Sequence, residues 1–155
     1  MTAAQSYLSA LTVEDVAGLR QLETVTNLSF WGEDNYRKFL EDYPEYFGCK
    51  VVVLNSSNEW EMVGFFLARS LFENLEILKV GVEPAYQRLG LGTQLMEAAY
   101  AEGIKRACRR CFLEVRKSNQ SAIEFYLRHR FRFAGTRLNY YSNPVEDAWI
   151  MERDL

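Results

Sequence analysis

The sequence predicts a mixed α/β sandwich, and three observations support this fold class. Runs of strand length, rich in β-branched or apolar residues, alternate with segments of helical periodicity. Along the chain we expect two helices, a group of strands, and then helix, strand, helix and two closing strands. The 155 residues, of which 48% are hydrophobic, suffice for one domain over 1–155 with one sizeable core.

The first segment of the chain predicts two helices. Thr12 and Asp15 form a helix-start pattern, and apolar residues follow at helical spacing, so a helix is expected over 12–27. A second, shorter helix is expected over 33–42, before the next proline.

Strands dominate the middle of the chain. The β-branched run 50–54, the turn 55–58 and the run 60–67 predict a hairpin, and a third strand is expected over 75–82. Gly81 inside that third strand has no packing reason in the sequence, which suggests a bulge or the close approach of a ligand. The later elements are a helix over 91–107, a strand over 111–115, a helix from the capping residues 118–122 to about 130, and closing strands over 131–140 and 147–151.

The stretch 80–93 changes from an apolar strand to a helix that starts at two glycines. Gly90 and Gly92 carry no β-carbon, so we expect successive backbone N–H groups at the helix start to close on a phosphate, helped by the positive end of the helix dipole. The same spacing also fits a simple tight turn between a strand and a helix. Neither the Gly-Lys-Ser/Thr of a triphosphate loop nor the Gly-x-Gly-x-x-Gly of a dinucleotide fold is present.

The sequence instead has Gln87-x-x-Gly90-x-Gly92 directly after Val80-x-Val82, which resembles the acetyl-coenzyme A pyrophosphate motif of the GCN5-related N-acetyltransferases (GNAT). The resemblance implies the GNAT fold: a mixed, mostly antiparallel sheet of about seven strands, flanked by about four helices and splayed at the acetyl-CoA site. It also implies acetyl-CoA as the co-substrate and no metal.

Two side chains fit acetyl transfer to an amine. Glu114 lies in the apolar run 111–115, where a carboxylate is either paired structurally or kept for chemistry, because burying an unpaired charge is costly. An N-terminal amine has a pKa of about 7.7–8.0, so a base must take its proton, and Glu114 is the candidate, acting through a water molecule. Tyr126, in the following helix, is the candidate acid for the leaving thiolate.

Backbone groups are expected to hold the donor. The N–H groups from Arg88 to Thr93 are predicted to bind the pyrophosphate, and the side chain of Asn119 the pantetheine amides. A backbone N–H near Val80 or Val82 is predicted to meet the charge that develops on the thioester oxygen.

A narrower resemblance covers residues 77–151. The run Leu113-Glu114-Val115-Arg116-x-Ser118-Asn119-x-x-Ala122-Ile123-x-x-Tyr126, with Arg137-x-Asn139-Tyr140-Tyr141 and Glu146-Asp147-Ala148-x-Ile150-Met151, is similar to the bacterial ribosomal-protein-alanine N-acetyltransferases; the first half matches only in element order. This implies Glu114 and Tyr126 as catalytic residues and Trp31, Tyr140 and Tyr141 as acceptor contacts. The implied coenzyme contacts are Val80, Gly81, Val82, Arg88, Leu89, Gly90, Leu91, Gly92, Thr93 and Asn119.

Two segments depart from that family's pattern. Arg128-His129-Arg130-Phe131 replaces a helix ending that usually contains glycine, so this C-cap must be made otherwise, and His129 is interpreted as a surface or capping side chain. Phe30-Trp31-Gly32 stands where the family often has Pro-Trp-Ser in the loop that faces the substrate.

Charge and cysteine content indicate which partners and which cellular compartment to expect. The net charge of −3 argues against direct nucleic-acid binding and is compatible with a cationic acceptor. The three cysteines fit a reducing compartment, and Cys108 and Cys111 are interpreted as small buried residues. An acidic segment either draws a basic acceptor or is merely solvated: Glu33, Asp34, Glu41, Asp42 and Glu45. No apolar run approaches the ~20 residues of a membrane span and no export leader is recognised, so a cytoplasmic protein with no membrane contact is expected.

These observations favour an enzyme that transfers acetyl from acetyl-CoA to the α-amine of a protein N-terminus, with a ribosomal protein as a candidate acceptor, by direct attack in a ternary complex. Two alternatives remain open. One keeps the donor and acetylates a small amine, and the other is a non-catalytic sensor of acyl-CoA.

Overall fold

The computed structural model describes residues 5–41 and 43–155. The strands are β1 (Ser6–Ala10), β2 (Tyr46–Leu54), β3 (Trp60–Leu71), β4 (Asn74–Val82), β5 (Arg110–Arg116), β6 (Arg132–Ser142) and β7 (Val145–Asp154). The helices are α1 (Val16–Val25), α2 (Glu33–Glu41), α3 (Leu91–Lys105) and α4 (Gln120–Arg128), with short 3₁₀ turns η1 (Val13–Asp15) and η2 (Pro84–Tyr86). Within the described residues, no helix is long and apolar enough to cross a membrane.

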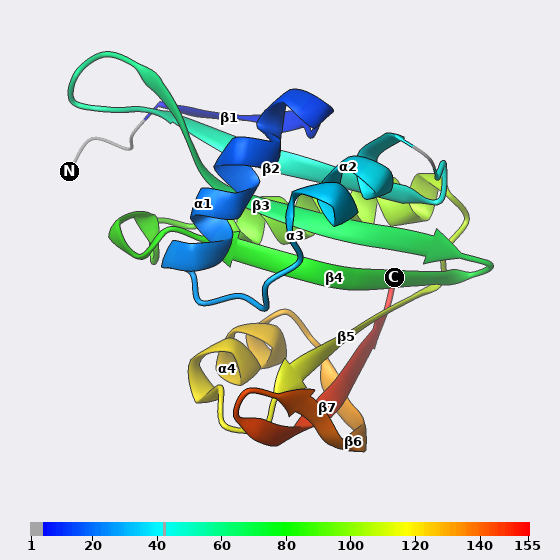
Figure 1. The fold of residues 1–155 in the computed structure, drawn as a ribbon. Helices are drawn as coiled ribbons and strands as arrows, with labels where there is room; N and C mark the ends of the chain where they lie inside the picture. The colour runs from blue at the N-terminus through cyan, green and yellow to red at the C-terminus, as the bar shows by residue number, and fades with distance from the viewer. Residues whose placement is uncertain (1–4, 42) are drawn as a thin grey trace.

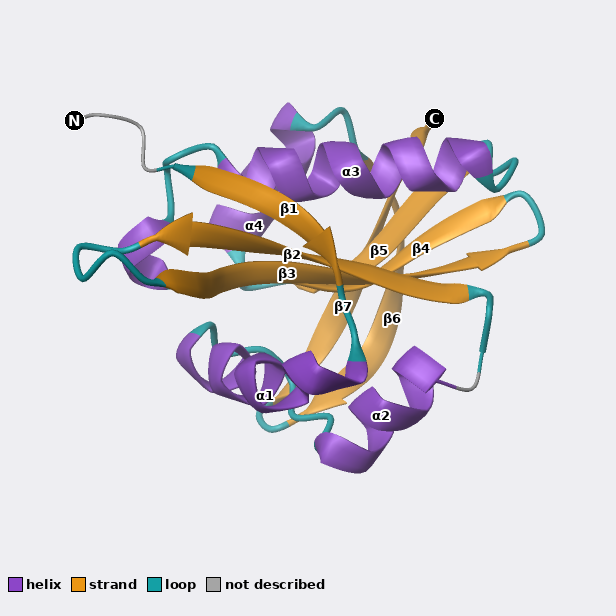
Figure 2. Ribbon diagram, turned by 90° about the horizontal axis from the view of Figure 1, so that it is seen from above, coloured by secondary structure: helices purple, strands orange, loops and turns teal. Residues whose placement is uncertain are grey.

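One seven-stranded sheet, in the order β1-β2-β3-β4-β5-β7-β6, forms the centre of the molecule. Figure 2 shows α3 and α4 on one face of this sheet and α1 and α2 on the other. All neighbouring strands are antiparallel except β4 and β5. The predicted fold class, a mostly antiparallel sheet flanked by four helices, is therefore confirmed.

Most predicted elements are present, with shifted ends. Strand β1 was not predicted, because it is a short edge strand whose residues are mostly half-buried or exposed, so it lacks a clear alternation. Strand β2 begins at Tyr46, before the β-branched run, and the predicted helix 12–27 divides into η1 and α1. The Thr12 N–H donates to the Asp15 carboxylate (2.9 Å), as expected for a helix start. The predicted end of the second helix, Asp42, lies outside the described residues.

The sheet opens between β4 and β5, as expected for a splayed site. Their parallel pairing runs only from Asn74↔Arg110 to Ile77↔Leu113, and beyond it the strands diverge (Figure 1). Backbone groups of β4 after Ile77 that would bond to β5 in a continuous sheet therefore face this opening.

A β-bulge lies in β4, but not at Gly81. Gly81 pairs regularly with Phe65, whereas Lys79 pairs with Leu67 and Ile77 with Ala68, which leaves Leu78 as the extra residue. Because an extra residue reverses the alternation of side chains, residues before and after Leu78 change faces. Of the two expectations for Gly81, a bulge at that residue is wrong, because the bulge of this strand lies at Leu78, and the close approach of a ligand stays a prediction.

Because of this reversal, side chains at the end of β4 pack into two different hydrophobic cores. Ile77 and, after the bulge, Val82 belong to the core under α3. Lys79 instead reaches the side of α1 and α2, where its ammonium bonds to Glu23. That second core contains Leu11, Val16, Leu19, Leu22, Tyr36, Phe39, Phe65 and Leu67.

Candidate functional site

The loop between η2 and α3 forms a cradle of free backbone donors. Arg88 (φ 63°) and Gly90 (φ 82°) both adopt left-handed backbone conformations. The Gln87 side chain donates to the Val82 carbonyl (2.9 Å), which fixes the loop to the end of β4. Within the described residues, no N–H from Arg88 to Thr93 has a hydrogen-bond acceptor, while the next one, of Gln94, bonds to the Gly90 carbonyl (3.0 Å). Successive free donors at a helix start suit an anionic diphosphate.

The two glycines differ in their surroundings. A β-carbon on Gly90 would have no protein atom within 4 Å, and the left-handed backbone there (φ 82°) favours glycine. A β-carbon on Gly92 would lie 3.3 Å from Phe125 of α4, so Gly92 allows the two helices to approach closely. Gly81 also has a packing reason that the sequence did not reveal: a β-carbon there would lie 3.2 Å from Thr26 and 3.1 Å from Leu28.

Asn119 begins helix α4. Its side-chain oxygen accepts from the Ala122 N–H (3.2 Å), so this oxygen caps the helix and the amide NH₂ group is left for other partners. The preceding Ser118 N–H donates to the Glu146 carboxylate (2.6 Å), which holds the start of α4 against β7. The carboxylate is further paired with Arg116 (3.3 Å).

Glu114 is paired, and its partner was not predicted. Its side chain is 13% exposed, and its carboxylate lies 2.6 Å from the guanidinium of Arg137 on β6. The carboxylate also raises the pKa of the neighbouring Tyr140 phenol to about 12. The structural alternative for this carboxylate is therefore confirmed, and a role in chemistry stays a prediction. Glu114 lies on β5 directly after the last residue that pairs with β4.

Tyr141 lies close to this carboxylate, and Tyr126 of α4 lies close to Tyr141. Burial raises the pKa of the Tyr126 phenol, with a contribution from Tyr141, so the phenol is protonated at neutral pH. Tyr140 and Tyr141 stack edge to face, with ring centroids 5.1 Å apart. They follow a bulge in β6 at which Asn139 adopts a positive φ, so the adjacent tyrosines are both near Glu114.

The loop between α1 and α2 is fastened to the sheet through Trp31 and its neighbours. The Trp31 N–H donates to the Glu23 carboxylate (2.9 Å), and its ring lies 5.1 Å from the Lys79 ammonium. Phe30 beside it is 78% exposed. The Trp31 ring packs against the rings of Tyr36 and Phe39, so Trp31 packs with α2 and not with Tyr140 and Tyr141.

The acidic segment is partly neutralised. Glu33 is paired with Arg37 (3.1 Å) and Arg20 (3.4 Å), whereas Asp34 and Glu41 are exposed.

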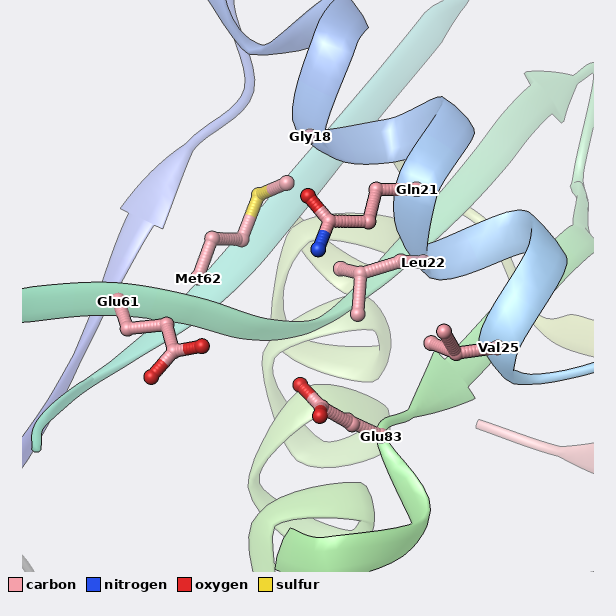
Figure 3. Close-up of a pocket in the computed structure, with 7 residues that line it drawn as sticks. All are labelled: Gly18, Gln21, Leu22, Val25, Glu61, Met62 and Glu83. Atoms are coloured by element: carbon pink, nitrogen blue, oxygen red, sulfur yellow. The ribbon is translucent and has the colours of Figure 1, made fainter.

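Two cavities lie on the α1 and α2 side. One, of about 160 Å³, has the carboxylates of Glu61 and Glu83 and the amide of Gln21 on its wall (Figure 3). The other, of about 420 Å³, lies beside Trp31 and is lined by aromatic side chains of α2 and β2 together with Asn35 and Lys38. None of the predicted coenzyme contacts lines either cavity.

The unusual ending of α4 is a Schellman cap made without glycine. Arg130 takes the left-handed conformation (φ 64°), and the Phe131 N–H donates to the Tyr126 carbonyl (3.0 Å). His129 is the capping residue, as predicted, and its ring nitrogen lies 3.2 Å from the Thr93 hydroxyl of the cradle. Burial lowers the pKa of His129.

Sequence reasoning missed Glu23 and Lys79, and it missed the pairing of Arg137 with Glu114, although Arg137 belongs to one of the quoted motifs. The adjacent apolar pair Ile77-Leu78, which interrupts the alternation of β4, could have located the bulge and hence the face of Lys79. The motifs give no indication of either ion pair, because the two partners lie far apart along the chain.

A splayed sheet beside a row of free N–H groups at a helix start defines the class of the protein as an acyl-coenzyme A transferase. The model of the acetyltransferase (GNAT) family matches residues 16–131. The chain belongs to this family, and it is an acetyl-CoA-dependent N-acetyltransferase.

Relatives are similar over nearly the whole chain. Ribosomal protein bS18-alanine N-acetyltransferase of Salmonella typhimurium is 30% identical over 146 residues, which cover 93% of this chain and 94% of that protein. The Escherichia coli protein of the same name is 29% identical over equal shares. The crystal structure of the ribosomal-protein-S18-alanine N-acetyltransferase from Escherichia coli superposes with a TM-score of 0.82 at 28% identity, covering 97% of this chain and 94% of that one.

Proposed function

We propose that the chain transfers the acetyl group of acetyl-CoA to the α-amine of a protein N-terminus, with a ribosomal protein as the first candidate acceptor. The observation that carries this proposal is the similarity to bS18-alanine N-acetyltransferases over 146 residues. It includes α1, α2 and their connecting loop, for which the sequence motifs gave only the element order. A cytoplasmic location accords with this proposal and rests on the sequence alone.

The proposed roles on the donor side rest on backbone groups. The free N–H groups from Arg88 to Thr93 would bind the diphosphate, and the amide NH₂ of Asn119 would bind the pantetheine arm. Backbone N–H groups near Val80, Gly81 and Val82, at the opening of the sheet, would meet negative charge on the thioester oxygen. Acetyl-CoA supplies the activated acyl group.

The proposed proton transfers use two side chains. Glu114, oriented by Arg137, would accept the proton of the attacking amine through a water molecule. Tyr126, whose raised pKa keeps its phenol protonated, would donate a proton to the leaving sulfur. Trp31, Tyr140 and Tyr141 would line the acceptor side, where aromatic surfaces and the exposed acidic side chains suit a cationic peptide.

The proposal is tested with purified protein, labelled acetyl-CoA and a ribosomal extract, followed by mass spectrometry of protein N-termini. Labelled α-amines on one or a few proteins are the expected result. A parallel assay compares basic N-terminal peptides with polyamines and free amino acids. Faster turnover of the small amines would replace the protein acceptor with a small-molecule one.

A further inference from the structure

A buried ion pair connects β4 to the loop between α1 and α2. The ammonium of Lys79 lies 2.8 Å from the carboxylate of Glu23, and their side chains are 2% and 3% exposed. Lys79 is on β4 within the opening of the sheet, and Glu23 is near the end of α1. The ion pair thus joins β4, the strand at the opening of the sheet, to α1, the helix that leads into the loop.

Every polar partner of this pair belongs to the loop or to the helix after it. Lys79 donates to the Ser29 carbonyl and lies 3.4 Å from its hydroxyl. The Glu23 carboxylate accepts from the Trp31 N–H (2.9 Å) and the Tyr36 hydroxyl (2.8 Å). Residues 29 and 31 are therefore each held by one member of the pair.

Packing supports the same connection. Gly81 lies on the face of β4 that carries Lys79, because side chains alternate along a strand. Thr26 and Leu28 contact Gly81 so closely that a β-carbon there would lie within 3.2 Å of both. The loop over 26–31 therefore rests on the same short length of β4 that borders the opening.

Stability alone does not account for such a pair. Two buried charges lose their hydration, and an apolar pair of similar volume is often at least as stabilising. What the charged groups add is directionality, since each carboxylate oxygen accepts and each ammonium N–H donates a hydrogen bond only within a narrow range of geometry. Burial lowers the pKa of Lys79, whereas the Glu23 carboxylate opposes this effect.

We propose that Lys79 and Glu23 are positioning residues for acceptor binding, which fix the loop over 26–31 against β4 at the distance from the acetyl group that the attacking amine requires. This inference rests on the proposed function, in which Trp31 in that loop contacts the acceptor. It assigns to a buried pair a role in acceptor affinity, with no role in binding acetyl-CoA.

The test compares Lys79→Met, Glu23→Gln and the double variant. Each single variant leaves one group of the pair without its charged partner, so both should melt at a lower temperature than the wild type. The double variant removes both charges and keeps an amide oxygen for Trp31 and Tyr36, so its melting temperature should recover. Its KM for a basic N-terminal peptide should nevertheless stay raised by at least about tenfold, because Ser29 has lost its donor. The KM for acetyl-CoA should stay at the wild-type value.

Lys50→Met is the matched control. Lys50 on β2 pairs with Asp15 (2.5 Å), which also joins the sheet to the start of the α1 region. The recorded hydrogen bonds of Asp15 within the described residues go to Thr12 and Lys50, and none goes to the loop over 26–31. This variant should lower the melting temperature and leave the peptide KM unchanged. A double variant with wild-type peptide KM, or one whose KM rises equally for peptide and acetyl-CoA, would overturn the inference.

Hydrogen exchange of the loop separates this inference from the proposed function. The backbone amide of Trp31 donates to Glu23, and Lys79→Met removes the ammonium that fixes this carboxylate. This amide should therefore exchange faster in Lys79→Met than in Lys50→Met, whichever amine the enzyme acetylates. If the wild-type protein fails to acetylate peptides and the loop is loosened only in the Lys79 variants, the proposed function fails but the positioning role stands. The KM comparison is then made with the amine that the enzyme does acetylate. Equal exchange in both variants would refute the positioning.

Discussion

The two sides of the proposed site use different chemical groups: backbone amides on the donor side and charged side chains on the acceptor side. The proposed donor side is a cradle of backbone N–H groups between Arg88 and Thr93, within one short segment. The proposed acceptor side depends on side chains that meet from distant positions: Glu23 bonds to Lys79 and Glu114 to Arg137. The first therefore depends on φ and ψ angles, and the second on which side chains are charged.

This difference indicates how each side can change. A backbone cradle tolerates most substitutions that keep its conformation, because the donors are present whatever the side chain. A side-chain arrangement loses a contact with each single substitution. We therefore expect donor specificity to be the more robust property of this chain and acceptor specificity the more variable one.

The largest effect is expected where the two sides meet. Glu114→Gln should lower kcat/KM by about 10²–10⁴-fold, because the amide cannot take the amine's proton. Affinity for acetyl-CoA, measured by calorimetry, should remain near the wild-type value. Unchanged turnover would remove Glu114 from the chemistry and leave it as the partner of Arg137.

Glu76→Gln is the control for this variant. Glu76 is also a strand carboxylate paired with an arginine, Arg69, and its side chain is 17% exposed. It lies at the end of β4 away from the cradle, so its loss should affect stability and leave turnover nearly unchanged.

The next effect concerns the proton given to the leaving group. Tyr126→Phe should slow turnover by roughly 10²-fold without weakening acetyl-CoA binding. Burial raises the pKa of Tyr126, so its phenol stays protonated as the pH rises past neutral. A fall in rate at alkaline pH should therefore not come from this residue.

Tyr100→Phe is the matched control, since its buried hydroxyl has no hydrogen-bond partner among the described residues. Equal rates for both variants would exclude Tyr126 as the acid.

What could be predicted from the sequence divides in the same way, between backbone and side-chain features. The cradle was predicted from a contiguous run, because Gly90 and the strand before it determine the backbone there. The sheet was predicted except for β1, an edge strand with one neighbour. The bulge was placed at Gly81, because a glycine within a strand is the commoner indication, whereas the alternation had broken at Leu78. The partners of Glu23 and Glu114 could not be predicted, because only the folded sheet brings them together.

A glycine substitution tests the backbone side directly. Gly90→Ala forces alanine into the left-handed conformation of this position (φ 82°), which costs roughly 1–2 kcal/mol or about 5–30-fold in affinity. Calorimetry should show weaker acetyl-CoA binding by this factor, with the peptide KM nearly unchanged. Gly92→Ala is the comparison: its backbone is helical, and the close contact with Phe125 is the cost. A Gly90→Ala variant with full affinity would show that the cradle does not need this conformation.

The smallest effect is a gain in stability at the cap of α4. Arg130 holds a left-handed conformation (φ 64°) that glycine adopts without strain. Arg130→Gly should raise the melting temperature by up to about 4 °C. Affinity for acetyl-CoA should stay unchanged, because the cap keeps His129 beside Thr93 through backbone bonds. Arg128→Gly, at the last residue of α4, should instead lower the melting temperature, since glycine relieves no strain at a helical position and costs up to about 1 kcal/mol relative to alanine. A lower melting temperature for Arg130→Gly would mean that the arginine side chain contributes more than the strain of its backbone, and that this donor-side turn depends on side chains as the acceptor side does.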